Sequence, residues 1–533
     1  MTARRLQRFP DFASSGAGKH FAILVICAFV AAAGVARWCM ASGIGISPDS
    51  VFYLSAADSV IAGHGLRPIA YHYTPTVASG KPQAVFPPVY PLLLSLSDLF
   101  STDRLAAAMW FHSLVFAANV CLVATMAYLA TAGSAAAAIA ALMLFITSPR
   151  LLEVHTMAWS DPPFMLFALS SMLFLMLHIA RPRKWLLASV SLTTALALTT
   201  RYVGITMLPP MIVAILLLEN QHLKRCILDG VVVIGAGLSP LVAWLVRNVL
   251  IADSTTSRSF ALHPIGMSDL NDAVTALLML SLPFSGNAYV KATSFCVVCG
   301  LMVVGLTLVL KHERPIGSAA AMNASVQVLA ALFVTSYVLF LFAYNSLVDP
   351  AVELDSRVLA PAYVFALVLV IAAVYKLSID RHSMAVWRGF LALAFALTAV
   401  NGARTVSFAI HRHDEGSSFT SADWVHSASI QYVKTLSEAR TIYSNGVDAI
   451  HVLTGREALR IPAKVDPMNG KRITGFDGEM NAARGEVIRQ RAVVVYFDRI
   501  AWRSYLPSKD ELEDFYMLPV LVRLDDGVVY GIK

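Results

Sequence analysis

A polar stretch over residues 46–94 contains the side chains that are best placed to do chemistry. It directly follows the first strongly apolar segment, opens with Asp49 and ends in a proline-rich run around Tyr90. A carboxylate at this position can act as a general base or hold a cation. It can also belong to a helix start, because Ser47-Pro48-Asp49-Ser50 is typical of an N-terminal cap. This stretch alone leaves both interpretations open.

Four more ionisable residues stand at the ends of apolar segments: Asp161, Arg201, Arg247 and Arg357. Charges in or beside such segments are costly, which makes them candidates for function. A planar guanidinium can bind a phosphate through two parallel hydrogen bonds. A carboxylate nearby can supply a base, a cation ligand or both. Together the four residues and Asp49 predict a site for an anionic lipid phosphate.

Each of the four also has an ordinary structural alternative. Asp161 precedes two prolines and is a plausible helix cap. Arg247 can extend to lipid head groups, and Arg201 can belong to a buried ion pair. Arg357 can pair with the nearby Asp355 or Glu353.

The elements that must position these residues lie in a membrane. The chain has 533 residues, of which 57% are hydrophobic and only 14% charged, and its mean hydropathy is +0.65. Soluble domains carry about a quarter charged residues, so we predict an integral membrane protein. The net charge of +7 then reflects the sidedness of the loops, and no nucleic-acid partner is expected.

Apolar segments long enough to cross a bilayer need about 20 residues each, or fewer if they are broken. The segment 88–100 is too short and is predicted to be re-entrant or interfacial. The sequence predicts about eleven spans, at residues 20–40, 105–130, 134–149, 161–180, 185–200, 202–218, 227–247, 292–310, 325–346, 357–377 and 387–409.

The distribution of Lys and Arg in short loops predicts the orientation. With eleven spans, all the basic clusters fall on one side, which should be the cytoplasm, together with residues 1–19. The first outer loop, 41–104, and the tail from 410 onward fall on the other side. We therefore predict a helical membrane domain over 20–409 and a separate extracytoplasmic domain over 410–533.

The tail changes character, because charges become frequent and long apolar runs stop. Residues 421–439 predict one amphipathic helix with a Ser/Asp start. The runs TIYSN and AVVVYFD predict short buried strands, and VLVRLDDGVVYGI predicts a hairpin through Asp525-Asp526-Gly527. We expect a small α/β domain that serves as a cap or docks the acceptor.

Several short motifs occur at the ends of the predicted spans or in the loops between them. They are Asp49 with the following FYLSAA helix, Gly63-His64-Gly65-Leu66, Pro87-Pro88-Val89-Tyr90-Pro91, Ser160-Asp161-Pro162-Pro163, Thr200-Arg201-Tyr202, Arg247-Asn248 and Arg357-Val358-Leu359-Ala360-Pro361. In this order and at these positions relative to the spans, they resemble the GT-C superfamily of polytopic glycosyltransferases, in the bacterial branch near protein mannosyltransferases and the lipid A aminoarabinose transferase. The resemblance covers residues 20–409.

This resemblance implies an inverting transfer of one sugar from a polyprenyl-phosphate donor, on the outer face of the cytoplasmic (inner) membrane. The acceptor is a surface glycan, a lipid or a protein. Asp49 matches the acid that is taken as general base or metal-assisted activator, and Asp161 a second acid that positions the acceptor or a cation. Arg357, Arg247 and Arg201 would hold the donor phosphate. Further motif residues predicted to bind substrate are Tyr53, His64 and Tyr90.

The sequence departs from the family pattern at two places. Ser50 follows Asp49 where a second acid is common, so the use of a divalent metal by Asp49 and Asp161 stays open. Phe86 stands where a lysine often precedes the first Pro-Pro, and Lys81 is the nearest cation.

Two other classes of function remain as alternatives. A transporter or flippase of a lipid-linked sugar or another anion is one, but that class places its ionisable groups near the bilayer midplane. Here they cluster at one boundary. A non-catalytic scaffolding protein with the same architecture is the other.

Overall fold

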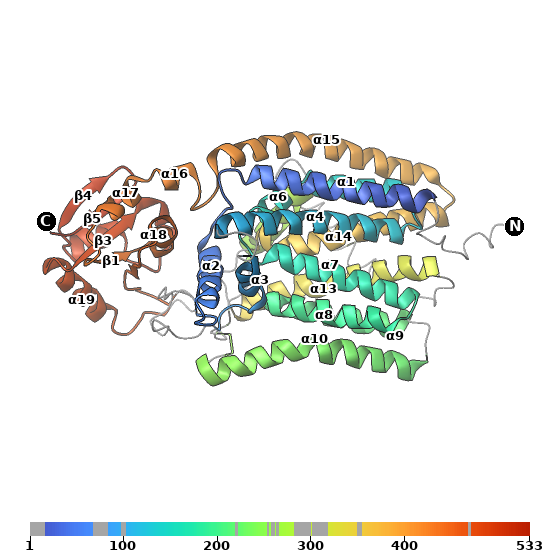
Figure 1. Cartoon of the computed structure of the whole chain (residues 1–533), viewed down its shortest axis with the longest axis horizontal. Coiled ribbons are helices and arrows are strands. Elements are labelled where there is room, and N and C mark those ends of the chain that lie inside the picture. Colours follow the sequence, from blue (N-terminus) through green and yellow to red (C-terminus); the bar gives the residue numbers. More distant parts are fainter. Residues whose placement is uncertain are drawn as a thin grey trace.

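The computed structural model describes residues 16–67, 84–97, 103–218, 222–252, 255–256, 262, 266–281, 300, 318–348, 354–466 and 471–532. A bundle of long helices is followed by a smaller domain with a β-sheet (Figure 1). The two parts lie end to end. Helix α1 begins at the far end of the bundle from this second domain.

The bundle contains helices of very different length. Their bounds are α1 Gly16–Cys39, α2 Pro48–Ile61, α3 Val89–Ser97, α4 Arg104–Ala130, α5 Ala135–Ile146, α6 Pro149–His155, α7 Asp161–Ala180, α8 Lys184–Thr200, η1 Tyr202–Met207, α9 Leu208–Leu218, α10 Leu223–Ala252, α11 Met267–Ser281, α13 Ser318–Leu347, α14 Ser356–Asp380 and α15 Met384–Glu415. Ser134 caps α5 and Ser148 caps α6, and Pro149 stands in the first turn of α6.

Seven described helices are long and apolar enough to cross a membrane, and α5 with α6 forms an eighth if this pair, bent by 68°, is one span. The seven are α1, α4, α7, α10, α13, α14 and α15. The predicted spans 185–200 and 202–218 correspond to the shorter α8 and to η1 with α9. The predicted span 292–310 lies outside the described residues. Residues 89–97 of the short segment at 88–100 form α3, and its re-entrant or interfacial position stays a prediction.

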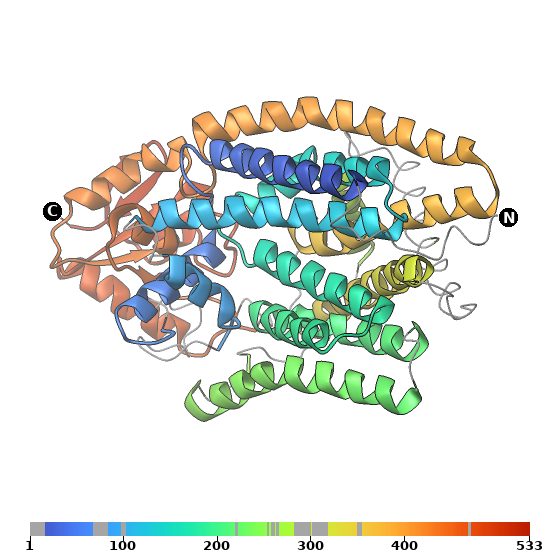
Figure 2. The same cartoon turned by 45° about the vertical axis from the view of Figure 1, so that its right-hand side comes forward.

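Helices α15 and α10 form opposite edges of the bundle in both views, and α1 lies next to α15 (Figures 1 and 2). Large apolar side chains on them are exposed, including Val30 at 66%, Leu250 at 75% and Phe395 at 76%. In helix α4, by contrast, 78% of the most apolar stretch is buried inside the protein. Exposed apolar surface on this scale fits contact with lipid.

The second domain is built on a five-stranded sheet in the order β2-β1-β3-β5-β4. Strand β1 pairs in parallel with β2 and β3, while β5 runs antiparallel to β3 and β4. The two predicted strands and the hairpin are confirmed. The strands are β1 Thr441–Ser444, β2 Leu459–Arg460, β3 Ala492–Phe497, β4 Val520–Leu524 and β5 Gly527–Tyr530, and the helices are α16 Ala422–Val425, α17 Ala428–Thr435, α18 Val447–Thr454 and α19 Phe476–Ile488.

The single helix predicted over 421–439 is wrong, because the structure has two short helices there, α16 and α17. The chain leaves the helical conformation at Ser427, whose hydroxyl accepts a hydrogen bond from the Ile430 amide and so starts α17. The same hydroxyl donates to the Asp526 carboxylate in the β4–β5 turn. This contact with the sheet outweighs the local helical pattern.

A continuous apolar core joins the second domain to α2 and α3. It contains Val51 and Leu54 of α2 together with Val447 and Ile450 of α18. The backbone is joined as well, because the Phe419 amide donates to the Ile46 carbonyl at 3.1 Å. The second domain therefore packs directly against the helix that begins at the predicted functional acid.

Candidate active site

Helix α2 begins with a cap that leaves Asp49 available. Ser47 is the cap residue, and its hydroxyl and that of Ser50 each accept a hydrogen bond from the other's backbone amide. The Trp159 indole donates to the Ser47 hydroxyl at 2.8 Å. The capping role that the sequence left open for Asp49 thus falls to the serines, and the Asp49 carboxylate turns toward α14.

Four of the predicted residues meet in one chain of alternating charges. Arg357 donates from Nη2 to Asp49 Oδ2 at 2.8 Å and from Nε to Asp161 Oδ2 at 3.0 Å. Arg201 forms an ion pair with the other oxygen of Asp161. Asp161 is fully buried, whereas the Asp49 side chain is 37% exposed. Two guanidinium groups compensate the buried acid, and Asp49 is the solvent-facing end of the cluster.

The elements that hold this cluster meet through short backbone contacts. Residue Gly45 pairs with the segment before α7, accepting from the Ala158 amide at 2.9 Å and donating to the Thr156 carbonyl at 3.0 Å. A Cβ at position 45 would stand 2.0 Å from the Met157 sulfur, so any larger residue would require the Met157 side chain to move. This contact fixes the start of α2 against the start of α7, and so brings Asp49 near Asp161.

Two further contacts position Arg357: the cap at the start of its own helix and the Trp159 ring. Asp355 caps α14 by accepting from the Val358 amide at 2.9 Å. The Arg357 guanidinium carbon lies 4.3 Å from the centre of the Trp159 ring, a cation–π contact. The pairing of Arg357 with Asp355 that the sequence allowed is not formed among the ion pairs of the described residues.

Tyr53 and Tyr90 support the cluster from behind. The Tyr53 hydroxyl lies 3.0 Å from that of Ser160, and the Tyr90 hydroxyl lies 2.8 Å from Nε2 of His112. Burial raises the pKa of both tyrosines well above the ordinary value. Both therefore stay protonated, and their rings pack 4.8 Å apart.

Two predicted residues lie outside the cluster's contacts. His64 is exposed on the turn after α2. Arg247 is half-buried, with its guanidinium 4.5 Å from the Trp244 ring centre, and it donates to the Asn248 side chain at 2.9 Å. Substrate binding by both residues stays a prediction. Lys81 lies outside the described residues.

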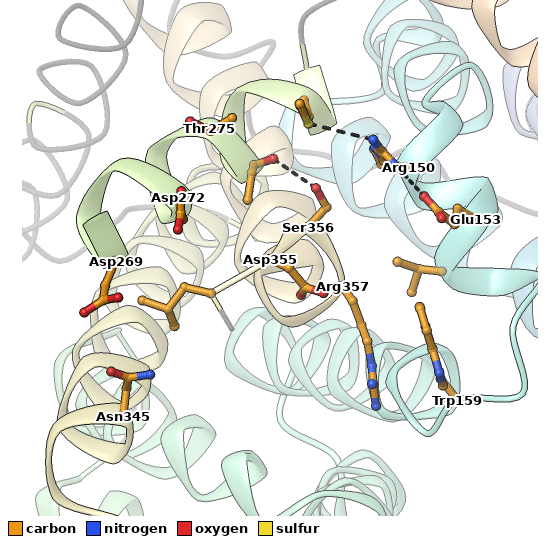
Figure 3. Close-up of a pocket in the computed structure, with 14 residues that line it drawn as sticks. Arg150, Glu153, Trp159, Asp269, Asp272, Thr275, Asn345, Asp355, Ser356 and Arg357 are labelled. Atoms are coloured by element: carbon orange, nitrogen blue, oxygen red, sulfur yellow. Dashed lines mark hydrogen bonds and ion pairs between the residues drawn. The ribbon is translucent and has the colours of Figure 1, made fainter. Parts of the chain in front are cut away.

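A cavity of about 450 Å³ opens beside Arg357 (Figure 3). Trp159 and Arg357 lie side by side at one wall, and α11 with its carboxylates forms the opposite one. Apart from Arg357, sequence reasoning did not assign the polar residues of this cavity to a site. The available signal was Arg150, a cation in a predicted outer loop, where basic residues are unusual. The polar lining consists of Arg150, Glu153, Trp159, Asp269, Asp272, Thr275, Asn345, Asp355, Ser356 and Arg357.

The carboxylates of this site are not arranged as ligands of a metal ion. No group of three or more His, Cys, Asp or Glu side chains is arranged to hold a metal within the described ranges. The predicted ligands Asp49 and Asp161 both direct an oxygen at Arg357, which stands where a shared cation would bind. The donor set does not fit a metal in this arrangement.

Part of the chain matches a known protein family. Residues 85–244 match the family described as dolichyl-phosphate-mannose-protein mannosyltransferase, a segment that includes Asp161 and Arg201. No curated protein matches the chain in sequence.

The fold is similar to that of apo ArnT, and two further solved structures align more weakly. The apo state of ArnT from Cupriavidus metallidurans aligns with a TM-score of 0.51 and 13% identity, covering 96% of this chain and 98% of ArnT. ArnT bound to undecaprenyl phosphate aligns with a TM-score of 0.47 and 13% identity, covering 95% and 97%. The arabinosyltransferase EmbB from Mycobacterium smegmatis gives 0.33 and 17%, covering 72% of this chain and 41% of EmbB.

The family match and the fold shared with apo ArnT confirm the predicted resemblance to GT-C glycosyltransferases. The chain is a multi-pass membrane protein, its residues 85–244 match a mannosyltransferase family, and its fold is similar to that of apo ArnT.

Proposed function

We propose that this enzyme transfers a sugar from a polyprenyl-phosphate donor to a hydroxyl of a cell-surface glycan, lipid or protein, with inversion. One observation carries the proposal. Arg357 joins the partly exposed Asp49 to the buried Asp161 at the edge of a cavity large enough for a sugar and its phosphate. A base and a cation for the leaving group are thus adjacent.

The donor class is supported by the family match, whose description names dolichyl phosphate, a polyprenyl phosphate, as the carrier of mannose. ArnT, which shares the fold in its apo state, has also been solved with undecaprenyl phosphate. In our proposal, the phosphate lies against Arg357, with Arg201 and Arg247 as further cations. Arg150, at the cavity wall, adds a cation that the sequence did not indicate.

The proposed chemistry has two requirements. Asp49 removes the proton from the acceptor hydroxyl as its oxygen attacks the anomeric carbon, while the bond from this carbon to the phosphate oxygen breaks. Arg357 stabilises the negative charge that grows on the departing phosphate. When a phosphate approaches Arg357, it competes with Asp49 for the same guanidinium. Donor binding thereby frees the Asp49 carboxylate to act as base.

The proposed location is the cytoplasmic membrane. We place residues 1–19 in the cytoplasm, the catalytic domain at 20–409 in the membrane, and the domain at 410–533 on the outer face with the active site. The site and the second domain lie at the same end of the bundle, which is consistent with this placement (Figure 1).

The test is transfer by the purified protein. It is incubated with candidate polyprenyl-phosphate sugars and an acceptor extract, with and without a chelator, and products are identified by mass spectrometry. Asp49→Asn should lower transfer about 1,000-fold, as loss of a general base does, while insertion and thermal stability remain. Wild-type activity in that variant would exclude Asp49 as the base. Movement of donor across proteoliposomes without a covalent product would support the transporter instead.

A further inference from the structure

A second polar group lies behind the cluster and takes no part in the chemistry proposed so far. It consists of Tyr90 on α3, His112 and Asn119 on α4, and His155 at the end of α6. All four side chains are fully buried. Two histidines and an amide in a helical core are costly unless each hydrogen-bonding atom has a partner.

The hydrogen bonds fix the protonation of both rings. Nδ1 of His112 lies 3.2 Å from the His155 carbonyl, and Nδ1 of His155 lies 2.7 Å from the Leu151 carbonyl. Because carbonyls only accept, both Nδ1 atoms carry a hydrogen. Nε2 of His112 then accepts from the Tyr90 hydroxyl, and Nε2 of His155 accepts from Asn119 at 3.0 Å. Both imidazoles are neutral, each in one tautomer.

The chain of hydrogen bonds ends on the backbone of α7. The Asn119 amide donates its second hydrogen to the Pro162 carbonyl at 3.1 Å, one residue after Asp161. Helix α7 lacks a side-chain cap of its own, because Ser160 makes no capping hydrogen bond and faces Tyr53 instead. Asn119 is thus a further group that contacts the first turn of α7.

The buried Asn119 side chain has one unsatisfied polar atom. Its Oδ1 atom is buried and accepts no hydrogen bond from the described residues. A residue kept only to fill space in this core would be better apolar, since an unpaired buried oxygen destabilises the fold. The amide is explained by its two donated hydrogen bonds, to His155 and to the Pro162 carbonyl.

We propose that Asn119 and His155, supported by His112 and Tyr90, are positioning residues for the transfer reaction. They hold the first turn of α7, and through it the Asp161 carboxylate that orients Arg357. This inference rests on the proposed function, because it assigns a purpose to the placement of Arg357. None of the four residues lines the cavity.

A double-mutant cycle with Asp161 tests the inference. Asn119→Ala should lower kcat about tenfold or more, because a misplacement near 1 Å at a reacting group has effects of this order. In an Asp161→Asn background the same substitution should lower kcat less than about twofold, since Asn119 acts through Asp161. Equal fold-losses in both backgrounds would overturn the inference.

Ser113→Ala is the matched control. Ser113 is fully buried on the same helix and bonds only within it, to the Met109 carbonyl at 2.7 Å. It should leave kcat within about twofold of wild type. A loss as large as that of Asn119→Ala would mean that any polar loss in α4 impairs the enzyme, and would also overturn the inference.

A second readout separates this inference from the proposed function. The same cycle is measured as shifts of the thermal unfolding midpoint of the full chain in detergent, without substrate. Non-additive shifts for Asn119→Ala and Asp161→Asn support the coupling even if the wild-type protein transfers no sugar. Absence of transfer overturns the proposed function alone, whereas additive midpoint shifts overturn the positioning role alone.

Discussion

Two buried arginine–carboxylate contacts in this molecule look alike and are built differently. In the second domain, Arg503 places Nη2 2.6 Å from one oxygen of Asp448 and Nη1 3.2 Å from the other, with side-chain exposures of 2% and 1%. Its Nη1 also donates to the Asn445 carbonyl at 2.6 Å. In the bundle, Arg357 divides its donors between Asp49 and Asp161, is 19% exposed and borders a cavity.

The different surroundings of the two arginines suggest a structural role for Arg503 and a substrate-binding role for Arg357. The fork of Arg503 is filled by one carboxylate in a closed environment, so an incoming anion has no access to it. Arg357 contacts two acids on separate helices, and one of them, Asp49, is partly exposed. An arginine shared in this way can exchange one partner for a substrate while keeping the other. The comparison predicts opposite consequences for the two pairs.

Arg357→Lys should have the largest effect, a loss of transfer on the order of 100- to 1,000-fold. Lysine keeps the positive charge beside Asp161 but cannot contact both acids and a phosphate from one planar group. The measurement is kcat/KM for the donor, with thermal stability as control. A variant that retains transfer within a few-fold would remove the distinction between the two arginines.

Asp448→Asn should show the reverse pattern. Removing this charge leaves the Arg503 guanidinium buried without its anion, at a cost on the order of 3 kcal/mol in unfolding free energy. Transfer at a temperature where the protein is folded should stay within about threefold. Denaturant unfolding followed by Trp fluorescence measures the first quantity. Lost transfer in a fully folded variant would contradict the structural role of this pair.

Asp526→Asn should destabilise the second domain by about 2 kcal/mol at neutral pH, because charged hydrogen bonds are lost. Burial disfavours the Asp526 carboxylate, yet hydrogen bonds from Ser427 and Ser429 outweigh it and hold its pKa below the usual range. The stabilisation is therefore complete above the unfolded pKa near 4 and fades as pH falls through the lower folded value. Unfolding of wild type and variant from pH 7 to pH 3 checks this. A constant difference would contradict it.

Arg247→Gln should have the smallest effect, a rise of the donor KM of about threefold with kcat unchanged. Its guanidinium lies on Trp244 and Asn248, so a contact with the donor phosphate would be peripheral and partly screened. Donor titration at fixed acceptor measures it. A loss as large as that of Arg357→Lys would place Arg247 among the central groups.

The sequence could predict which residues meet but not how they pair. Asp49, Asp161, Arg201 and Arg357 all stand at span ends, so counting spans and basic loops places them at one face. Hydropathy does not encode the rotation of each helix or the order of its neighbours. The sharing of Arg357, the cavity on α11 and the buried contacts of Asn119 depend on those rotations and were not predicted.

Short local signals gave mixed results for a related reason. The Ser-Pro-Asp-Ser run does start a helix. Only the structure shows that Ser47 and Ser50 form the cap and that the Asp49 carboxylate takes no part in it. The predicted tail helix breaks at Ser427, because the Asp526 turn, distant in sequence, supplies a better hydrogen-bond partner. In both cases tertiary contacts decide between local options that the pattern alone leaves equal.

The hydrogen bond from the Phe419 amide to the Ile46 carbonyl has a consequence for the order in which the protein matures. Ile46 leaves the ribosome early, whereas Phe419 is made only after every described helix of the bundle. Contacts so distant in sequence form late in folding, because the chain between them must first be ordered. The start of α2 thus acquires its final support only when synthesis is nearly finished. We expect a truncated or stalled chain to insert its early spans and yet lack a competent Asp49.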